Sequence, residues 1–167
     1  MHRSWLGALL LALLASCDTG LSPLNEPSGF RGVMRFRNWP PPDSVRELRL
    51  VAFESIPTDS TSVFAALLAG TAAVYPVLER QLPRFVDSVE YEFTTKTGVN
   101  LKVATYQYVI VAWQYGPNIF ADWRPAGVYA RQPNSFEPAS VRVILHRVTP
   151  NINIEVDFRN TPQWPWR

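Results

Sequence analysis

Alternation of apolar and polar residues is the feature that most limits how this chain can fold. In residues 152–158 (Ile-Asn-Ile-Glu-Val-Asp-Phe) every second side chain is apolar, and residues 89–93 repeat the pattern as Val-Glu-Tyr-Glu-Phe. A period of two places the apolar side chains on one face of a strand and the polar ones on the other. Each such strand needs one buried and one solvated face, which is the signature of a β-sandwich.

Several other segments carry strand-like patterns. We expect further strands at 33–37, 45–53, 101–112 and 141–145, and a short edge strand at 127–130. Residues 106–112 are nearly continuous in apolar character, which predicts a central strand buried on both faces. In that strand we expect Tyr106, Tyr108 and Ile110 on one face and Val109 and Val111 on the other.

Residues 56–84 interrupt the strand pattern. Residues 58–61 offer helix-capping side chains, and Gly70 can end a helix. Between them lies an apolar stripe at helical spacing, made of Val63, Phe64, Leu67 and Leu68. Because Pro76 and Pro83 follow, we expect one short helix and then an irregular or edge-like segment. The prediction is an all-β fold, a seven- or eight-strand β-sandwich with one short helical insertion.

The first sixteen residues have the pattern of a secretory signal. A basic Arg3 precedes an apolar run over residues 5–15, and the small residue Ser16 follows. A stable membrane span takes about 20 apolar residues, so this run is too short for one. It predicts export from the cytoplasm rather than a permanent span.

The residues that end this run, Leu14, Ala15, Ser16 and Cys17, resemble the bacterial lipobox. The resemblance implies cleavage before Cys17 and attachment of lipid, including palmitate-type acyl chains, to that cysteine, which would hold the protein at a membrane. An ordinary secretory signal followed by a free cysteine, or an uncleaved core helix, stays open as an alternative. Asp18 resembles an enterobacterial inner-membrane retention signal, but other bacteria do not follow that rule, so the choice of membrane stays open.

Residues 17–29 lack apolar periodicity and are rich in Gly, Pro, Ser and Asn. Such a stretch is typical of a flexible tether. The expected organisation is a lipoprotein signal peptide at 1–16, a lipidated tether at 17–29 and a β-sandwich domain at 30–167.

Composition excludes several functions. The formal charge is +2, from 16 Lys+Arg against 14 Asp+Glu, and no basic stripe is present, so nucleic acid is not an expected partner. A single cysteine excludes an intrachain disulfide and a thiolate zinc site. His146 is the one histidine beyond the signal, and no motif indicates a metal or a cofactor.

A second resemblance concerns the predicted domain. Tyr91-Glu92-Phe93, then Gly98, residues 106–112 and Gly116 resemble the strand, turn and strand pattern of transthyretin-like, carboxypeptidase-regulatory-type β-sandwich domains. Gly32-Val33 resembles their opening strand. Residues 99–104 and the helical insertion depart from that pattern, and an Ig-like sandwich remains the alternative.

A cluster of aromatic and polar residues follows the predicted central strand. The candidate binding patch is Trp113, Tyr115, Asn118, Phe120, Asp122, Trp123 and Arg124. Exposed, these aromatics would offer flat faces to a glycan or to another envelope protein. The alternative is that Phe120 and Trp123 cover the open end of the sandwich.

Enzymatic activity is the competing class. Glu90 and Glu92 lie on the same side of one predicted strand, about 7 Å apart, which approaches the carboxylate separation of inverting glycosidases. Nothing in the sequence indicates that either is desolvated, and a solvated sheet face explains both. We therefore expect a membrane-anchored envelope lipoprotein whose sandwich is a non-catalytic binding or assembly module. A glycan-binding protein is the alternative, followed by a hydrolase that uses these two glutamates.

Overall fold

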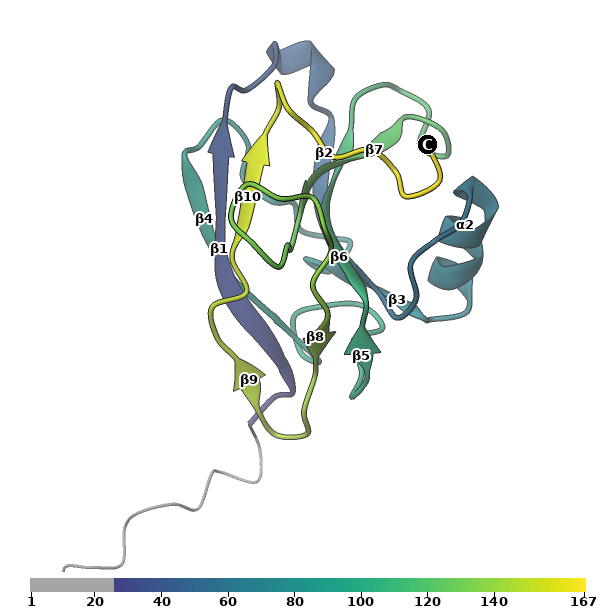
Figure 1. Cartoon of the computed structure of the whole chain (residues 1–167), viewed down its shortest axis with the longest axis vertical. Helices are drawn as coiled ribbons and strands as arrows, with labels where there is room; N and C mark the ends of the chain where they lie inside the picture. Colours follow the sequence, from purple (N-terminus) through teal and green to yellow (C-terminus); the bar gives the residue numbers. More distant parts are fainter. Residues whose placement is uncertain (1–25) are drawn as a thin grey trace, which may run out of the picture.

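The computed structural model describes residues 26–167, and their strands form two facing four-stranded sheets and one two-stranded ladder (Figure 1). Sheet A contains β1 (Gly29–Arg37), β4 (Ser88–Thr94), β9 (Val148–Thr149) and β10 (Ile154–Asp157). Sheet B contains β2 (Glu47–Phe53), β3 (Ala72–Tyr75), β6 (Tyr108–Gln114) and β7 (Trp123–Val128). The ladder pairs β5 (Thr105–Tyr106) with β8 (Val141–Arg142).

The predicted all-β sandwich with one short helix is confirmed. The described residues hold ten strands, one α-helix, α2 (Ser60–Leu68), and a 3₁₀ turn, η1 (Pro42–Ser44). The strand order is β10-β1-β4 in sheet A, where β9 also pairs with β1, and β3-β2-β6-β7 in sheet B. Ten strands exceed the seven or eight expected, because short edge and ladder strands of two to four residues carry little pattern of their own.

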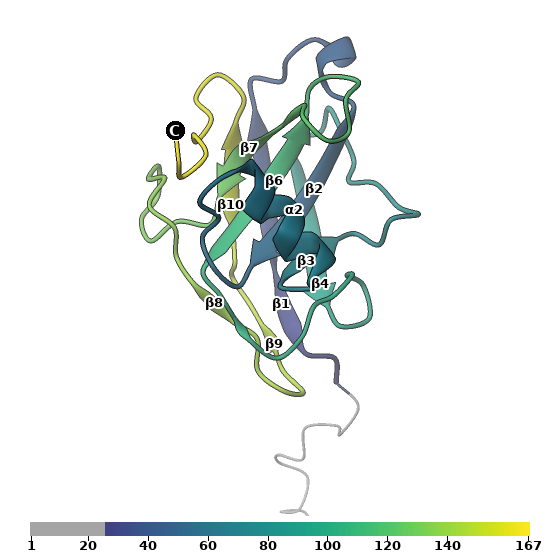
Figure 2. The same ribbon diagram turned by 90° about the vertical axis from the view of Figure 1, so that its right-hand side faces the viewer.

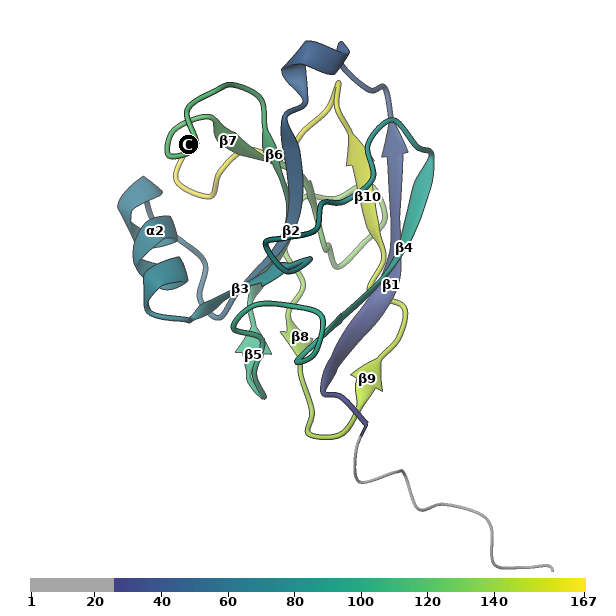
Figure 3. The ribbon, with the colours of Figure 1, turned by 180° about the vertical axis from the view of Figure 1, so that it is seen from behind.

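Alternation places the core between the sheets, as predicted. In β1, Phe30, Met34 and Phe36 are buried, whereas Arg31, Arg35 and Arg37 are exposed. Sheet B contributes inward side chains from its central strands, namely Leu48, Leu50, Val109, Val111 and Trp113. Figure 3 shows the resulting layers side by side: sheet A, sheet B and then α2.

The prediction of one continuous strand over 101–112 is wrong. Residues 101–104 lie outside any strand, and Tyr106 pairs with Val141 in the small ladder. After a break at Gln107, β6 pairs with β2 along its whole length. The break shifts the alternation, so Tyr106 joins the core between the sheets while Tyr108 and Ile110 lie on the outer side of sheet B.

Other strand boundaries also differ from the prediction. The expected edge strand at 127–130 begins earlier, at Trp123, and contains Pro125. A proline is tolerated there because β7 is an edge strand, with a register shift opposite Val111 and Ala112. The expected strand at 141–145 is reduced to β8, and residues 145–146 form a turn.

The helix forms where the capping residues predict it. Asp59 accepts a hydrogen bond from the Ser62 backbone, the Ser62 side chain bonds back to Asp59, and Gly70, at φ +67°, follows the last turn. Val63 and Leu67 pack on the outer face of sheet B, which Figure 2 shows behind α2. The expected stripe is only partly buried, because Leu68 is 90% exposed.

The chain joins sheet A slightly earlier than the predicted tether boundary at residue 29. Ser28 is buried, its hydroxyl accepts a hydrogen bond from the His146 backbone (2.9 Å), and its carbonyl accepts one from Thr95 (2.9 Å). These contacts fix the base of β1. The predicted signal peptide at 1–16, the lipobox residues Leu14, Ala15 and Ser16, the lipidation site Cys17 and the tether up to residue 25 lie outside the described residues.

Candidate functional site

The loop between β6 and β7 is held in one conformation by its own polar groups. Asn118 Oδ1 accepts hydrogen bonds from the backbone N–H groups of Phe120 (2.9 Å) and Ala121 (3.2 Å). Asp122 Oδ2 accepts one from the Asn118 N–H (2.8 Å), and the Asp122 carbonyl accepts one from Tyr115 (3.0 Å). Asn118 and Asp122 therefore stabilise the loop backbone.

This fixed loop presents two apolar side chains to solvent. Ile119 is 61% exposed and Phe120 is 69% exposed. The Phe120 ring lies 6.0 Å from the ring of Phe64 on α2, and Leu68 follows Phe64 by one helical turn on the same face. We call Phe64, Leu68, Ile119 and Phe120 the apolar patch. Its helical members, Phe64 and Leu68, belong to the apolar stripe that the sequence indicates at helical spacing.

Trp113 does not reach this surface. It is 2% exposed, its Nε1–H donates to the Ser44 carbonyl (2.7 Å), and its ring packs edge-on against Phe158 (5.0 Å). The Arg124 guanidinium covers it, 4.0 Å from the Trp113 ring centroid and 5.0 Å from that of Tyr115. Trp113 is thus a core residue, and only Tyr115 and Arg124 of this trio are exposed.

Trp123 is packed and Phe120 is exposed, but Trp123 packs on the outer face of sheet B rather than over the open end of the sandwich. Trp123 is half-buried against the outer face of sheet B, and its Nε1–H donates to the Ile119 carbonyl (2.9 Å). The Trp164 Nε1–H approaches the Trp123 carbonyl at 3.4 Å, and Trp164 stacks on Trp166 with ring centroids 4.7 Å apart. The C-terminal segment therefore covers sheet B beside α2 and leaves Phe120 in solvent.

A groove of about 320 Å³, lined mainly by polar and charged residues, opens beside β10. One wall comes from the outward side chains of sheet A, including Arg35, Arg37, Glu155 and Asp157, and the other from residues 131–136. No sequence pattern predicted this site. Alternation does predict that residues 35, 37, 155 and 157 are exposed, but no local signal predicts which loop lies against them.

Glu90 and Glu92 lie on the outer face of sheet A, both exposed, on edge strand β4. In the register with β1, Glu92 is opposite Arg31 and Glu90 is opposite Val33. Neither lines the groove. They belong to a solvated face on which acidic residues of β4 and β10 flank the arginines of β1.

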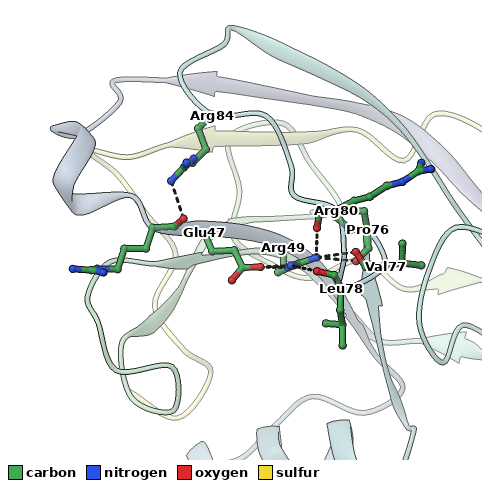
Figure 4. Close-up of polar contacts among 8 residues, drawn as sticks. Glu47, Arg49, Pro76, Val77, Leu78, Arg80 and Arg84 are labelled. Carbon is green, nitrogen blue, oxygen red and sulfur yellow. Dashed lines mark hydrogen bonds and ion pairs between the residues drawn. The ribbon is translucent and has the colours of Figure 1, made fainter.

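Among residues 26–167 one arginine, Arg49, is buried, and its contacts explain its position (Figure 4). Arg49 on β2 forms an ion pair with Glu47, and its guanidinium donates to the carbonyls of Pro76 (2.9 Å), Val77 (3.3 Å), Leu78 (3.3 Å) and Arg80 (2.8 Å). Arg84 holds the next part of the segment by donating to the carbonyls of Val45 (2.7 Å) and Arg46 (2.8 Å). The irregular segment after β3 is thus bound to β2 through its backbone.

Burial also raises the pKa of three tyrosines, Tyr91, Tyr106 and Tyr108. Desolvation raises the pKa of Tyr91, whose hydroxyl donates to the Ile152 carbonyl (2.6 Å), and it raises the pKa of Tyr108. Both hydroxyls therefore stay neutral at physiological pH. The pKa of Asp157, in contrast, is lowered by hydrogen bonds from the Asn38 side chain and the Arg159 backbone.

Residues 26–167 contain no group of three or more His, Cys, Asp or Glu side chains arranged to hold a metal ion. In the same part of the chain no helix has the length and apolar character needed to cross a bilayer. Comparison with protein-family models, with curated proteins and with solved structures found no match to this chain. The resemblances to lipobox proteins and to transthyretin-like domains therefore stay predictions.

Proposed function

We propose that this chain is a bacterial cell-envelope lipoprotein, anchored through Cys17, whose β-sandwich is a non-catalytic binding or assembly module for another envelope protein. The apolar patch is the observation that carries the binding role. A fixed loop that leaves Ile119 and Phe120 largely exposed is unfavourable in water unless a partner covers it. Burying a large apolar side chain contributes about 1.5–3 kcal/mol, so these two residues can contribute substantially to a complex.

The position of the patch favours a protein over the anchoring membrane as its partner. The chain enters the domain at the base of β1, whereas the loop between β6 and β7 lies toward the opposite end of the sandwich (Figures 1 and 2). A lipid anchor on Cys17 would then place the base of β1 nearest the bilayer and the loop away from it. Because internal hydrogen bonds already fix the loop, little conformational entropy is lost on binding.

The two alternatives have less support. A glycan on the loop would need exposed aromatic faces beside polar groups, but Trp113 is buried, and Asn118 and Asp122 are engaged with the loop backbone. A hydrolase would need Glu90 and Glu92 in a cleft that differentiates their environments, and both lie on an open sheet face.

The anchor is tested by metabolic labelling with an alkyne fatty acid in cells that express the full chain. We expect incorporation of the label and partition into detergent for the native sequence, and loss of both for Cys17→Ser. Label that persists in Cys17→Ser, or a native protein that retains residues 1–16 without lipid, would refute the anchor.

The binding role is tested by placing a photo-crosslinking phenylalanine analogue at position 120 of the lipidated protein in intact cells. We expect one discrete adduct, which the substitution Ile119→Ser reduces strongly. The matched control is position 145, because Leu145 is 61% exposed, close to the 69% of Phe120, but lies in the turn between β8 and β9, near the chain entry. Equal adducts from both positions, or no adduct from position 120, would contradict the proposed surface.

A further inference from the structure

The groove beside β10 is a second surface, separate from the apolar patch, and it lies where the two sheets meet. Edge strand β7 passes close to edge strand β10, and a Cβ on Gly127 would come within 2.6 Å of the Glu155 carbonyl oxygen. The absence of a side chain at Gly127 permits this approach. Beyond it, Val128 and Ala130 line the groove together with polar residues of β1 and β10.

The carboxylates of the groove already have partners. Glu155 forms an ion pair with Arg35 (3.1 Å). Asp157 Oδ1 accepts hydrogen bonds from Asn38 Nδ2 (2.8 Å) and from the Arg159 backbone (3.0 Å), which holds the pKa of Asp157 below its ordinary value. Both acids are therefore engaged with other groups of the chain.

The arginines leave positive charge for a ligand. Among residues 26–167, Arg37 forms no ion pair at contact distance, although it lies near enough to Asp157 to lower the pKa of that carboxyl. Arg131 pairs with Glu137 at 3.2 Å, but both side chains are about two-thirds exposed, at 65% and 68%, and such surface pairs contribute little. A ligand carboxylate can thus be met by Arg37, with Arg131 on the opposite wall.

The opposite wall is an ordered turn. Ala130 bridges to Pro138, the Arg131 N–H donates to the Glu137 carbonyl (3.1 Å), and the Ser135 N–H donates to the Gln132 carbonyl (3.2 Å). The turn carries the carboxamides of Gln132 and Asn134 and the ring of Phe136, which is 43% exposed. These side chains line the groove from a backbone that is already fixed.

We propose that this groove binds an acidic sugar, a small polyhydroxylated ring that carries a carboxylate. Carboxamides both donate and accept hydrogen bonds, which suits neighbouring hydroxyl groups, and the groove has four of them, on Gln132, Asn134, Asn153 and Asn160. Asn153 Oδ1 already accepts a hydrogen bond from the Val33 backbone (2.9 Å), so Asn153 meets a ligand through its Nδ2 group. Phe136 offers an apolar face to the C–H side of the ring, and Arg37 pairs with the carboxylate. The volume of 320 Å³ lies at the lower end of the range of about 300–1,000 Å³ for small-ligand pockets, so a mono- or disaccharide suits it.

Two simpler classes of ligand, a free anion and a neutral sugar, would each use only some of the side chains that line the groove. A free anion would use the arginines and leave the carboxamides and Phe136 without a role. A neutral sugar would leave Arg37 without a role. The proposal does not depend on the apolar patch or on the lipid anchor, so it can fail while the proposed function stands, and the reverse also holds.

The test is calorimetric titration of the full chain in detergent micelles with D-glucuronate, D-glucose and acetate. We expect glucuronate to bind at least about tenfold more tightly than either glucose or acetate. Arg37→Gln should lower the affinity for glucuronate at least about tenfold, because a charge-assisted hydrogen bond to the carboxylate is lost. Arg142→Gln is the matched control, since Arg142 is exposed on β8 and does not line the groove, and it should leave affinity unchanged.

Phe136→Ser supplies a second variant, from the other wall of the groove. It should lower the affinity for glucuronate without raising the affinity for acetate. Acetate that binds as well as glucuronate would reduce the groove to an anion site and overturn the proposal. The proposal would also be overturned if glucose and glucuronate bound equally well, or if Arg37→Gln and Arg142→Gln lowered the affinity for glucuronate equally. A titration with glucuronate that gives no heat would overturn it as well. Circular dichroism of each variant separates a loss of binding from a loss of folding.

Discussion

Replacing Arg49 by methionine tests whether a buried guanidinium holds the segment after β3 to sheet B. The substitution keeps most of the apolar stem but removes the donors that reach the carbonyls of residues 76–78 and 80. It also leaves Glu47 without its ion-pair partner. The folded state therefore loses several hydrogen bonds and retains a carboxylate that is partly removed from water.

The magnitude follows from the burial of the two partners. Removing one member of a buried ion pair costs about 3–5 kcal/mol. The Arg49 side chain is 9% exposed but that of Glu47 is 22% exposed, so the orphaned carboxylate regains some hydration, and we expect the lower end, about 3 kcal/mol. For a chain of this size each kcal/mol lowers Tm by about 2–4 °C, which gives about 6–12 °C.

The assay is urea unfolding followed by tryptophan fluorescence, combined with a thermal scan. Glu47→Gln should lower the free energy of unfolding less than Arg49→Met does, since it keeps all the hydrogen bonds from Arg49 to the carbonyls. Arg49→Met should also lower the free energy of unfolding less in the Glu47→Gln background than in the native protein. Arg46→Met is the matched control, because Arg46 is exposed and contributes its carbonyl, not its side chain, to the contact with Arg84. If Arg49→Met changed the free energy of unfolding by no more than about 0.5 kcal/mol, as ordinary surface substitutions do, the reasoning would be refuted.

Two further predictions concern buried and titratable groups of sheet A. Tyr91→Phe removes a buried hydroxyl and leaves the Ile152 carbonyl without its donor, so we expect a loss of about 1–3 kcal/mol in urea unfolding; an unchanged midpoint would contradict the role of this bond. The folded pKa of Asp157 is lowered, so its charged form stabilises the fold above the pKa of the unfolded state, and this contribution is lost as pH falls through the folded pKa. Asp157→Asn should therefore be less stable than the native protein at neutral pH and lose less stability on acidification; parallel pH profiles would exclude this contribution.

Much of the fold could be predicted because local patterns encode it. In β1 and β4 the side-chain period of two decides which residues face the core, and the structure places Phe30, Met34, Tyr91 and Phe93 inward as the alternation requires. Asp59 and Gly70 mark the ends of the helix through their own backbone and capping chemistry. These signals depend on residues close together in sequence.

The candidate sites depended on contacts that the sequence pattern does not contain. Trp113 and Phe120 are both aromatic and only seven positions apart, yet Trp113 is enclosed by η1 and Phe158 while Phe120 is exposed. The nearly continuous apolar run over 106–112 concealed a break at Gln107, because Tyr106 pairs with β8 and only the residues after Gln107 pair with β2. Position along the chain did not distinguish these environments.

The sequence by itself determined the alternation of its strands, the ends of its helix and the resemblance of its first seventeen residues to a lipoprotein signal. Only the tertiary structure decided which surfaces remain open. The groove joins Arg37 to a turn around Asn134, nearly a hundred residues later, and the apolar patch joins α2 to the loop after β6. The physical reason is that a strand's faces are set by its own period, whereas the neighbours of an exposed side chain are set by how distant segments pack together.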